Sequence, residues 1–327
     1  MNNQHLDANS GVPTTLGDST CEGLLLLGRS RRPHPPYKIR HGVAGACYYA
    51  GMNLAATLAD LGFDPEAPVD LAELNLHFAL GVDDPELDLP VYLSKLDDYA
   101  EELARRLESA NSLEARTLEL GHYLFEELGF AGNTGNYYDA RNSFLHEVLD
   151  RHLGIPISLS VLAIAVGERC GMTVRGVGLP GHFIAKVTDG DEEVLFDPYH
   201  GGALLTPAGC SELVVAVVGQ PFVANPANLR ATPPGIIASR MLNNLKAVYL
   251  QSAQFAKAVR VIEWLVPLNP GDASQQRDLG VTLVHANEPG RAIDPLTEYL
   301  KIAPNAADAD VVEDFLREAR RQVAKWN

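Results

Sequence analysis

Two short segments of the sequence carry residue types that could transfer protons together. His182 lies in the segment Pro-Gly-His-Phe at 180–183, and Asp197 lies in Phe-Asp-Pro-Tyr at 196–199. A carboxylate beside an imidazole fixes the tautomer of the ring and favours its charged form, which is the orienting half of a catalytic triad. The alternative interpretation is a hydrogen bond between His182 and Asp197 that only holds a hairpin together.

The backbone around this pair is predicted to form antiparallel strands, because β-branched and aromatic runs flank a turn that contains Asp and Gly. If Asp189 faces Glu192 across a two-residue turn, His182 faces Tyr199 on the next strand. His182 and Asp197 then share one face of the sheet as diagonal neighbours. The strand-like segments span 172–178, 181–188 and 194–199.

Helical patterns surround these strands. Leucines recur every three or four residues over 93–107 opposite an acidic face, and a second helical segment, 113–128, ends at Gly129. Residues 155–170 are apolar almost all round, which is typical of a central helix, and Pro156 suits its first turn.

A shorter helix is predicted just before the central one. Asn142 has the residue type of an N-cap, and Gly154 stands where the chain would leave that helix. The valine-rich segment 212–218 is predicted as a further strand. One helix packed against an antiparallel sheet is an α+β arrangement.

The last third of the chain repeats itself at a spacing of 34 residues, which is the period of tetratricopeptide repeats. Such helix pairs commonly bind protein segments. Two repeats and a final helix at 307–326 are few for a free-standing array, so we expect them to dock on the preceding domain. An irregular helical bundle is the alternative. The matching positions are Leu245 and Leu279, Tyr249 and Leu283, Ala258 and Ala292, Ile262 and Leu296, and Pro270 and Pro304.

These patterns predict an α+β protein in which an N-terminal helical region, a core of central helix and antiparallel sheet, and α-helical repeats follow one another. The polar N-terminus ends in the basic, Pro-rich stretch 28–40 and is predicted to be a disordered arm of unassigned role. The predicted parts are the arm at 1–42, the helical region at 43–135, the core at 136–225 and the repeats at 236–327.

Composition and charge narrow the class of protein. With 46% hydrophobic residues the chain can bury a core, and 26 Lys and Arg against 42 Asp and Glu give a net charge of −16. Such an acidic excess repels phosphate backbones and anionic lipids, so we predict a protein partner and neither nucleic acid nor membrane. The early apolar run Leu24–Leu27 is too short for a signal peptide or a membrane span, and the four cysteines are scattered, so we predict a cytoplasmic protein with free thiols.

Several short signatures, taken together and in this order, resemble a known family. They are the stretch 136–187, the segment Leu-Phe-Asp-Pro-Tyr-His-Gly-Gly at 195–202 and the repeats that follow. This set resembles the SirB family, in which a transglutaminase-like core precedes tetratricopeptide repeats, and the resemblance covers roughly residues 60 to 310. It implies a protein without established catalysis and with suggested regulatory roles.

The resemblance also identifies where a nucleophile would stand. Catalytic transglutaminase-like domains carry a Cys in a Gly-x-Cys pattern at the amino end of the central helix, whereas this chain has Gly154-Ile155-Pro156, and Pro stands at this point in the SirB pattern itself. Cys170 lies at the other end of that helix, roughly 20 Å away at 1.5 Å per residue. The thiol-dependent activities of the superfamily are therefore in doubt for this chain.

We thus expect a non-catalytic regulatory or scaffolding module that binds a protein through its C-terminal repeats. The alternative is a cysteine-independent hydrolase or acyltransferase in which His182 and Asp197 work with Ser158. Ser158 lies two positions after Pro156, about 200° round the helix, and serines at helix starts are usually caps. The sequence predicts neither the identity of the partner nor the oligomeric state.

Further residues are predicted to line the pocket around the pair. The resemblance aligns Asn142 and Ser143 with a characteristic Asn-Ser pair, and with Pro156 and Tyr199 they form the predicted binding set. A zinc site built from His182, Asp197 and His200 is a third possibility, but no fourth ligand is evident. We therefore predict no metal and no cofactor.

Overall fold

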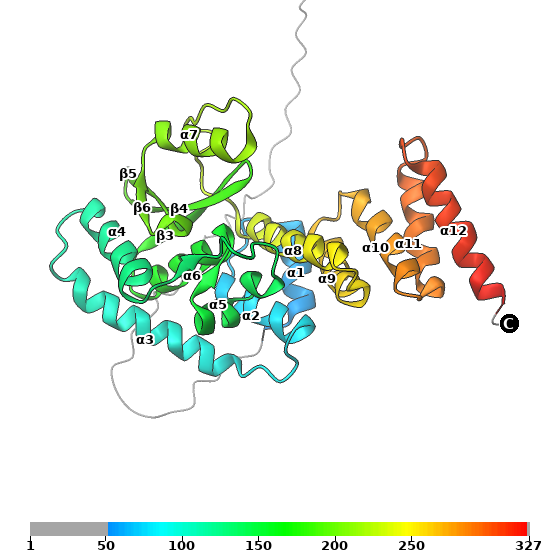
Figure 1. Cartoon of the computed structure of the whole chain (residues 1–327), viewed down its shortest axis with the longest axis horizontal. Coiled ribbons are helices and arrows are strands. Elements are labelled where there is room, and N and C mark those ends of the chain that lie inside the picture. The colour runs from blue at the N-terminus through cyan, green and yellow to red at the C-terminus, as the bar shows by residue number, and fades with distance from the viewer. Residues whose placement is uncertain (1–51, 326–327) are drawn as a thin grey trace, which may run out of the picture. The chain divides into compact units, whose positions relative to one another are not determined.

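The computed structural model describes residues 52–325 (Figure 1). The predicted disordered arm at 1–42 lies outside the described residues. Within them the α+β class is confirmed: a group of N-terminal helices, a central helix against an antiparallel sheet, and C-terminal helix pairs.

The N-terminal helices begin and end at recognisable capping residues. Asp70 accepts from two backbone N–H groups at the start of α2, and Ser112 caps α4 by accepting from the N–H of Ala115. The predicted leucine stripe lies on α3, whose leucines at 93, 96 and 103 are buried. The predicted helix over 113–128 is divided, because its second half winds into a π-helix, η1. The elements are α1 (Leu54–Phe63), α2 (Leu71–Val82), α3 (Leu89–Leu107), α4 (Leu113–Gly121) and η1 (His122–Glu127).

The central helix is α6 (Pro156–Arg169), and its residues from Pro156 to Gly167 are all buried. Pro156 takes the first helical position, where a missing N–H costs nothing. The helix packs against strands β3 (Thr173–Leu179) and β4 (His182–Asp189), as Figure 1 shows. A helix buried on every side needs no polar face, which explains the continuous apolar run in the sequence.

The sheet is an antiparallel meander of four strands in chain order, completed by β5 (Glu192–Asp197) and β6 (Ala203–Leu205). Asp189 pairs with Glu192 across the turn, so the predicted register is confirmed. Two residues from each of two distant segments form a separate parallel pair, β1 (Ala131–Gly132) and β2 (Leu153–Gly154).

The strand predicted at 212–218 is wrong, because this segment lies in helix α7 (Pro207–Val218). Thr206 accepts from the N–H of Gly209 and Pro207 takes the first position, so the start signal of a helix precedes the valines. Cys210 and Val214, one helical turn apart, are the buried residues of α7. Local capping and this spacing outweigh the β-propensity of Val.

The prediction for the shorter helix before α6 is wrong at both ends. Asn142 lies in the 3₁₀ turn η2 (Ala140–Ser143), and helix α5 (Leu145–Arg151) begins after it. The left-handed residue that ends α5 is His152, with φ 57°, and not Gly154. A Cβ on Gly154 would lie 2.8 Å from Ser158 Oγ, so its small size is required by the contact with α6 rather than by helix termination.

The C-terminal helices form the pairs that the repeat predicts. Ala258 and Ala292, which match at the repeat spacing, are both fully buried at the close helix contacts. The pairs are α8 (Pro234–Gln251) with α9 (Phe255–Leu268) and α10 (Ala273–His285) with α11 (Pro289–Ile302), followed by α12 (Ala309–Ala324).

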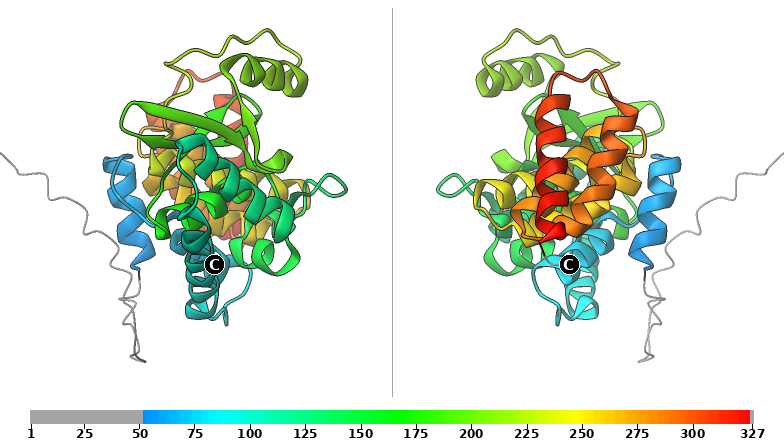
Figure 2. Two further views of the ribbon diagram at one scale, coloured as in Figure 1. Left: turned by 90° about the vertical axis from the view of Figure 1, so that its left-hand side faces the viewer. Right: turned by 90° about the vertical axis from the view of Figure 1, so that its right-hand side faces the viewer.

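The expected docking of the repeats on the preceding domain is confirmed for the first pair. Helices α8 and α9 contact α1 and α2, and their buried side chains belong to the same hydrophobic core as those of α6. Gly62 on α1 makes the closest approach, because a Cβ there would lie 2.0 Å from the Pro267 carbonyl oxygen. Helices α10 to α12 pack on one another around a second core, and Figure 2 shows them side by side in orange and red.

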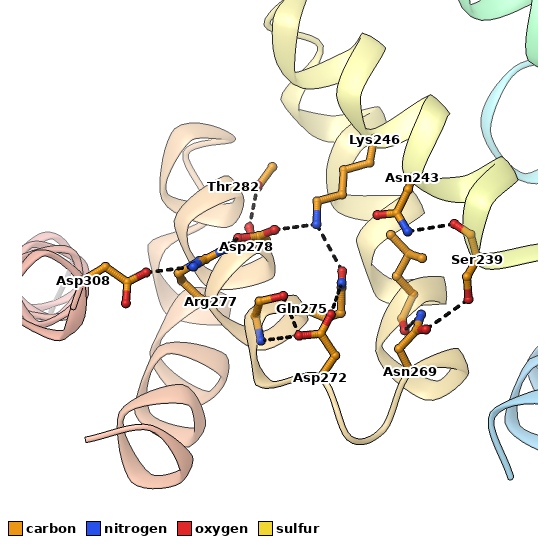
Figure 3. A network of polar contacts seen from close by, with 12 residues as sticks. Ser239, Asn243, Lys246, Asn269, Asp272, Gln275, Arg277, Asp278, Thr282 and Asp308 are labelled. Carbon is orange, nitrogen blue, oxygen red and sulfur yellow. Dashed lines mark hydrogen bonds and ion pairs between the residues drawn. The ribbon is translucent and has the colours of Figure 1, made fainter. Parts of the chain in front are cut away.

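A polar network joins the two repeats (Figure 3). The buried Lys246 ammonium on α8 donates to the Gln275 amide at 3.1 Å and pairs with Asp278, both on α10. Arg277 extends the network to Asp308 at 2.8 Å, next to α12. Directional hydrogen bonds and ion pairs, in addition to apolar packing, therefore fix the position of α10 relative to α8.

Candidate functional site

The predicted pair is assembled at the end of the sheet. His182 Nε2 lies 2.9 Å from Asp197 Oδ2, and the two side chains are only 4% and 2% exposed. His182 is the first residue of β4 and Asp197 is the last of β5, so the hairpin register alone brings them together. A hydrogen bond between such buried groups is strong because water does not compete for it.

Asp197 accepts from four groups. Its Oδ1 accepts from the backbone N–H of Tyr199 at 2.9 Å and of His200 at 3.4 Å, and its Oδ2 accepts from His182 and, at 2.7 Å, from His200 Nδ1. Burial by itself raises the pKa of this carboxyl, but the two imidazole contacts outweigh burial and hold the pKa below its usual value. Asp197 is therefore a carboxylate at neutral pH.

The two imidazole contacts also settle where the ring protons lie. A carboxylate oxygen only accepts, so His182 carries a proton on Nε2 and His200 carries one on Nδ1. The other ring nitrogen of His182, Nδ1, forms no hydrogen bond with any of residues 52–325. This is the arrangement of a general base oriented by a carboxylate.

The sequence predicts Tyr199 on a strand opposite His182, and this prediction is wrong. Strand β5 ends at Asp197, whose side chain caps the 3₁₀ turn η3 (Pro198–His200), and Tyr199 lies in that turn. The Tyr199 ring still meets the His182 ring edge-on at 5.9 Å between centroids. It packs on the backbone of Gly132, where a Cβ would lie 2.4 Å from the ring.

The amino end of α6 offers no free nucleophile within the described residues. Pro156 is buried and has none. The Ser158 hydroxyl accepts from the Ile155 N–H at 3.0 Å and donates to the Asn142 carbonyl oxygen at 2.6 Å, so it caps its own helix. The structure does not bring Ser158 into a hydrogen bond with His182.

Asn142 and Ser143 anchor the loop before α5. Asn142 is fully buried, and its amide donates to the carbonyl oxygens of Asn136 at 2.7 Å and Tyr137 at 3.2 Å. The Ser143 carbonyl oxygen accepts from Asn75 on α2 at 2.9 Å. Neither side chain is a helix cap, and both residues hold the 133–143 loop against α6 and α2.

Two cysteines lie within the described residues, and neither replaces a thiol at α6. Cys170 caps the far end of α6, and burial raises its pKa. Cys210 on α7 is fully buried; burial raises its pKa first, and the charge of Asp197 raises it further. Cys210 is therefore within electrostatic range of the pair, but as a neutral thiol with no hydrogen bond to His182. Cys21 and Cys47 lie outside the described residues.

Two clusters carry the residue types of a metal site. The ligand atoms of His182, Asp197 and His200 lie within 4.8 Å of one another, a donor set that suits zinc. Both imidazoles already donate to Asp197, so hydrogen bonds account for this geometry. In the second cluster, Asp83, His146 and Glu147, the carboxylates face Lys257 and Arg151. The absence of a metal and of a cofactor stays a prediction.

Two side chains beside the pair, those of His200 and Arg240, are not predicted from the sequence as its partners. His200 was considered only as a metal ligand, although its position two residues beyond Pro198 places it on the capping turn of Asp197. Arg240, on α8, donates to the His182 carbonyl oxygen at 2.9 Å. No local pattern connects residues 58 positions apart, so only the packing of α8 on the sheet reveals that contact.

Comparison with known proteins agrees with this architecture. Residues 91–243 match the transglutaminase-like superfamily, and residues 245–317 match a tetratricopeptide repeat. The fold and site thus define a transglutaminase-like core followed by tetratricopeptide repeats, which confirms the resemblance inferred from the sequence. No helix between residues 52 and 325 is both long and apolar enough to cross a membrane.

Individual relatives identify the family of the chain more specifically. A UPF0162 protein of Xylella fastidiosa (strain 9a5c) is 32% identical over 235 residues, which cover 71% of this chain and 84% of that protein. A UPF0162 protein of Vibrio cholerae is 26% identical over 58% of this chain and 70% of its own length. The chain belongs to the UPF0162 family.

A shorter match reaches beyond bacteria. Human F-box only protein 21 is 32% identical over 111 residues, which cover 31% of this chain and 18% of that protein. No solved structure matches the chain.

Proposed function

We propose that this protein is a non-catalytic, transglutaminase-like regulatory module that binds a protein partner through its C-terminal repeats. The observation that carries the proposal is the amino end of α6. Pro156 occupies the position that the family resemblance assigns to the nucleophilic Cys, and the Ser158 hydroxyl is committed to Ile155 and Asn142. Among residues 52–325, the pair therefore has no side chain at the amino end of α6 that could form a covalent acyl intermediate.

The His182–Asp197 pair then has a structural role. Asp197 joins the start of β4, through His182, to the turn η3 that follows β5, and so fixes the ends of these two central strands. Both carboxylate oxygens of Asp197 accept hydrogen bonds from groups inside the protein. This supports a stabilising role for the pair as strongly as it supports a role in orienting a catalytic imidazole.

A hollow of about 620 Å³ between α9, α10 and α11 supports the binding role of the repeats. Leu279, Leu283 and Pro295 supply its apolar part. Asp294 and Glu298 add carboxylates, and Arg291 in the same lining is paired with Glu263. Sites of this size with a few polar groups accommodate side chains of a bound segment. The net charge of −16 favours a basic segment as the occupant.

The catalytic alternative is tested with the full-length protein and its variants. A fluorophosphonate probe for serine and an iodoacetamide probe for thiols would be applied to the wild type, Ser158→Ala, His182→Ala and Cys210→Ser. We expect no serine labelling and no ester or amide turnover that depends on His182. Turnover lost in both His182→Ala and one nucleophile variant would establish an enzyme; Cys21→Ser and Cys47→Ser extend the test to the other two thiols.

The binding role is tested with the same full-length chain as bait. Asp294→Arg and Glu298→Arg reverse charges in the hollow, and Asp191→Arg makes the same change at the exposed β4–β5 turn. We expect a partner retained by the wild type and by His182→Ala to be lost in the hollow variants only. Equal retention by all variants would contradict binding at this place. Fractionation of cells tests the predicted cytoplasmic location.

A further inference from the structure

A guanidinium that has no carboxylate partner among residues 52–325 lies beside the strand that carries His182. Arg240 on α8 donates through Nη2 to the backbone oxygens of His182 at 2.9 Å and of Leu179 at 3.2 Å. Within residues 52–325, no Asp or Glu forms an ion pair with this side chain. An arginine in a chain of net charge −16 usually has an acidic neighbour, so this cation calls for an explanation.

The position of the guanidinium is well determined by its neighbours. It lies over the Phe183 ring, 5.1 Å from the centroid. A Cβ on Gly178 would lie 2.4 Å from Nη1, so the glycine leaves the room that the guanidinium fills. Burial lowers the pKa of Arg240, which means that the surroundings disfavour its charge. The charge is partly desolvated, and no acidic side chain of the described residues pairs with it to compensate for that cost.

The guanidinium also has unused donors. Arginine presents five N–H groups in a planar fork, and the two backbone contacts use only Nη2. Neither Nη1 nor Nε hydrogen-bonds an acceptor within the described part of the chain. Each of these nitrogens therefore keeps an N–H group that can donate a charge-assisted hydrogen bond to a carboxylate oxygen.

A second donor lies nearby. The Tyr137 side chain is 41% exposed, and Tyr199 and the charge of Arg240 both act on the pKa of its hydroxyl. Burial is the main cause that raises the pKa of Tyr137, which keeps its hydroxyl protonated and able to donate. The Asn142 amide holds the Tyr137 backbone at 3.2 Å and so fixes the loop that presents this ring.

We propose that Arg240, together with the hydroxyl of Tyr137, binds the carboxylate of a ligand at the end of the sheet where β4 begins. One cation and one neutral donor suit a singly charged carboxylate, whereas a phosphate dianion would need further positive charge that the described neighbours do not supply. The proposal concerns a site separate from the hollow in the repeats, and it holds whether or not the protein is an enzyme. Because α8 begins the repeats and also touches α6, a ligand here contacts both parts of the fold.

The test uses isothermal titration of the full-length protein with small probes of known charge. N-acetylglycine offers a terminal carboxylate, and the doubly blocked tripeptide acetyl-Gly-Glu-Gly-amide offers a side-chain carboxylate. N-acetylglycinamide is the uncharged control, and inorganic phosphate tests the competing anion. We expect at least tenfold tighter binding of one of the two carboxylates than of the amide. The carboxylate that binds identifies the source.

The variants are Arg240→Gln, Arg240→Lys and Tyr137→Phe, with Arg230→Gln as the matched control because Arg230 is exposed. We expect at least a tenfold loss of affinity in Arg240→Gln, a smaller loss in Tyr137→Phe, partial retention in Arg240→Lys and no change in Arg230→Gln. Circular dichroism checks that each variant is folded. Equal binding of the carboxylates and the amide by the wild type, or tighter binding of phosphate, would overturn the proposal without affecting the proposed function of the repeats.

Discussion

Replacing Asp197 by Asn tests whether the buried carboxylate holds the ends of β4 and β5 together. Asn keeps an oxygen for the two backbone N–H groups of Tyr199 and His200, but puts an NH₂ group where two imidazole N–H groups now donate. Hydrogen bonds to a charged acceptor contribute about 1.5–3 kcal/mol each. Both rings can shift their proton to the other nitrogen and accept from the amide, which recovers part of this loss. We therefore expect Asp197→Asn to lower the free energy of unfolding by about 2–4 kcal/mol at pH 7.

The assay is urea denaturation followed by far-ultraviolet circular dichroism, with Asp191→Asn as the control. Asp191 lies exposed in the β4–β5 turn, so the same chemical change there should alter stability by no more than about 0.5 kcal/mol. If Asp197→Asn costs no more than this control, the reasoning about the buried carboxylate is refuted.

The pH dependence of the difference gives a second check. The pKa of Asp197 is lowered in the folded protein, so its carboxylate contributes stability that is fully present above the unfolded pKa of about 3.9. That contribution is lost as the pH falls from about 4 through the lower folded pKa. The stability of the wild type relative to Asp197→Asn should therefore shrink on acidification below pH 4. A difference that grows over that range would contradict the assigned direction of the pKa shift.

Three further substitutions test the packing. Gly62→Ala should stabilise an isolated helix by about 1 kcal/mol. In the folded protein, however, the new Cβ would lie 2.0 Å from the Pro267 carbonyl oxygen, so we expect urea denaturation to show a destabilisation of about 1–3 kcal/mol. The control is Gly271→Ala, whose Cβ would have nothing within 4 Å and which should be neutral or slightly stabilising. Ala253→Gly should raise the thermal midpoint, because Ala253 is exposed with φ 55° and relief of that conformation is worth about 1 kcal/mol. Lys246→Met should lower the free energy of unfolding by about 1–3 kcal/mol, because it leaves buried polar partners without their donor; an unchanged urea midpoint would argue against the network in Figure 3.

Local patterns in the sequence were sufficient for much of this fold. The leucine spacing of α3, the apolar run of α6 and the 34-residue repeat each depend on residues that are near in the chain, and each is present in the structure. The hairpin turn at Asp189 and Glu192 set the register that brings His182 to Asp197, because a two-residue turn leaves one pairing for the strands that it joins. The wrong strand prediction at 212–218 arose where two local preferences conflict. In α7, a capping residue and a proline at the start of the helix outweigh the β-propensity of the valines.

Tertiary structure alone decided what surrounds the pair. Asn142 has the type of a helix cap, but the close packing of its loop on α6 makes its carbonyl oxygen the acceptor for Ser158, so a candidate nucleophile becomes a cap. Arg240 reaches the His182 strand from a helix 58 residues later, and Pro267 meets Gly62 from the repeats. Helices, strands and turns follow from backbone and side-chain preferences of residues that are near in the chain. These long-range contacts depend instead on how whole helices and strands pack around one core, and the spacing of residues along the sequence does not predict that packing.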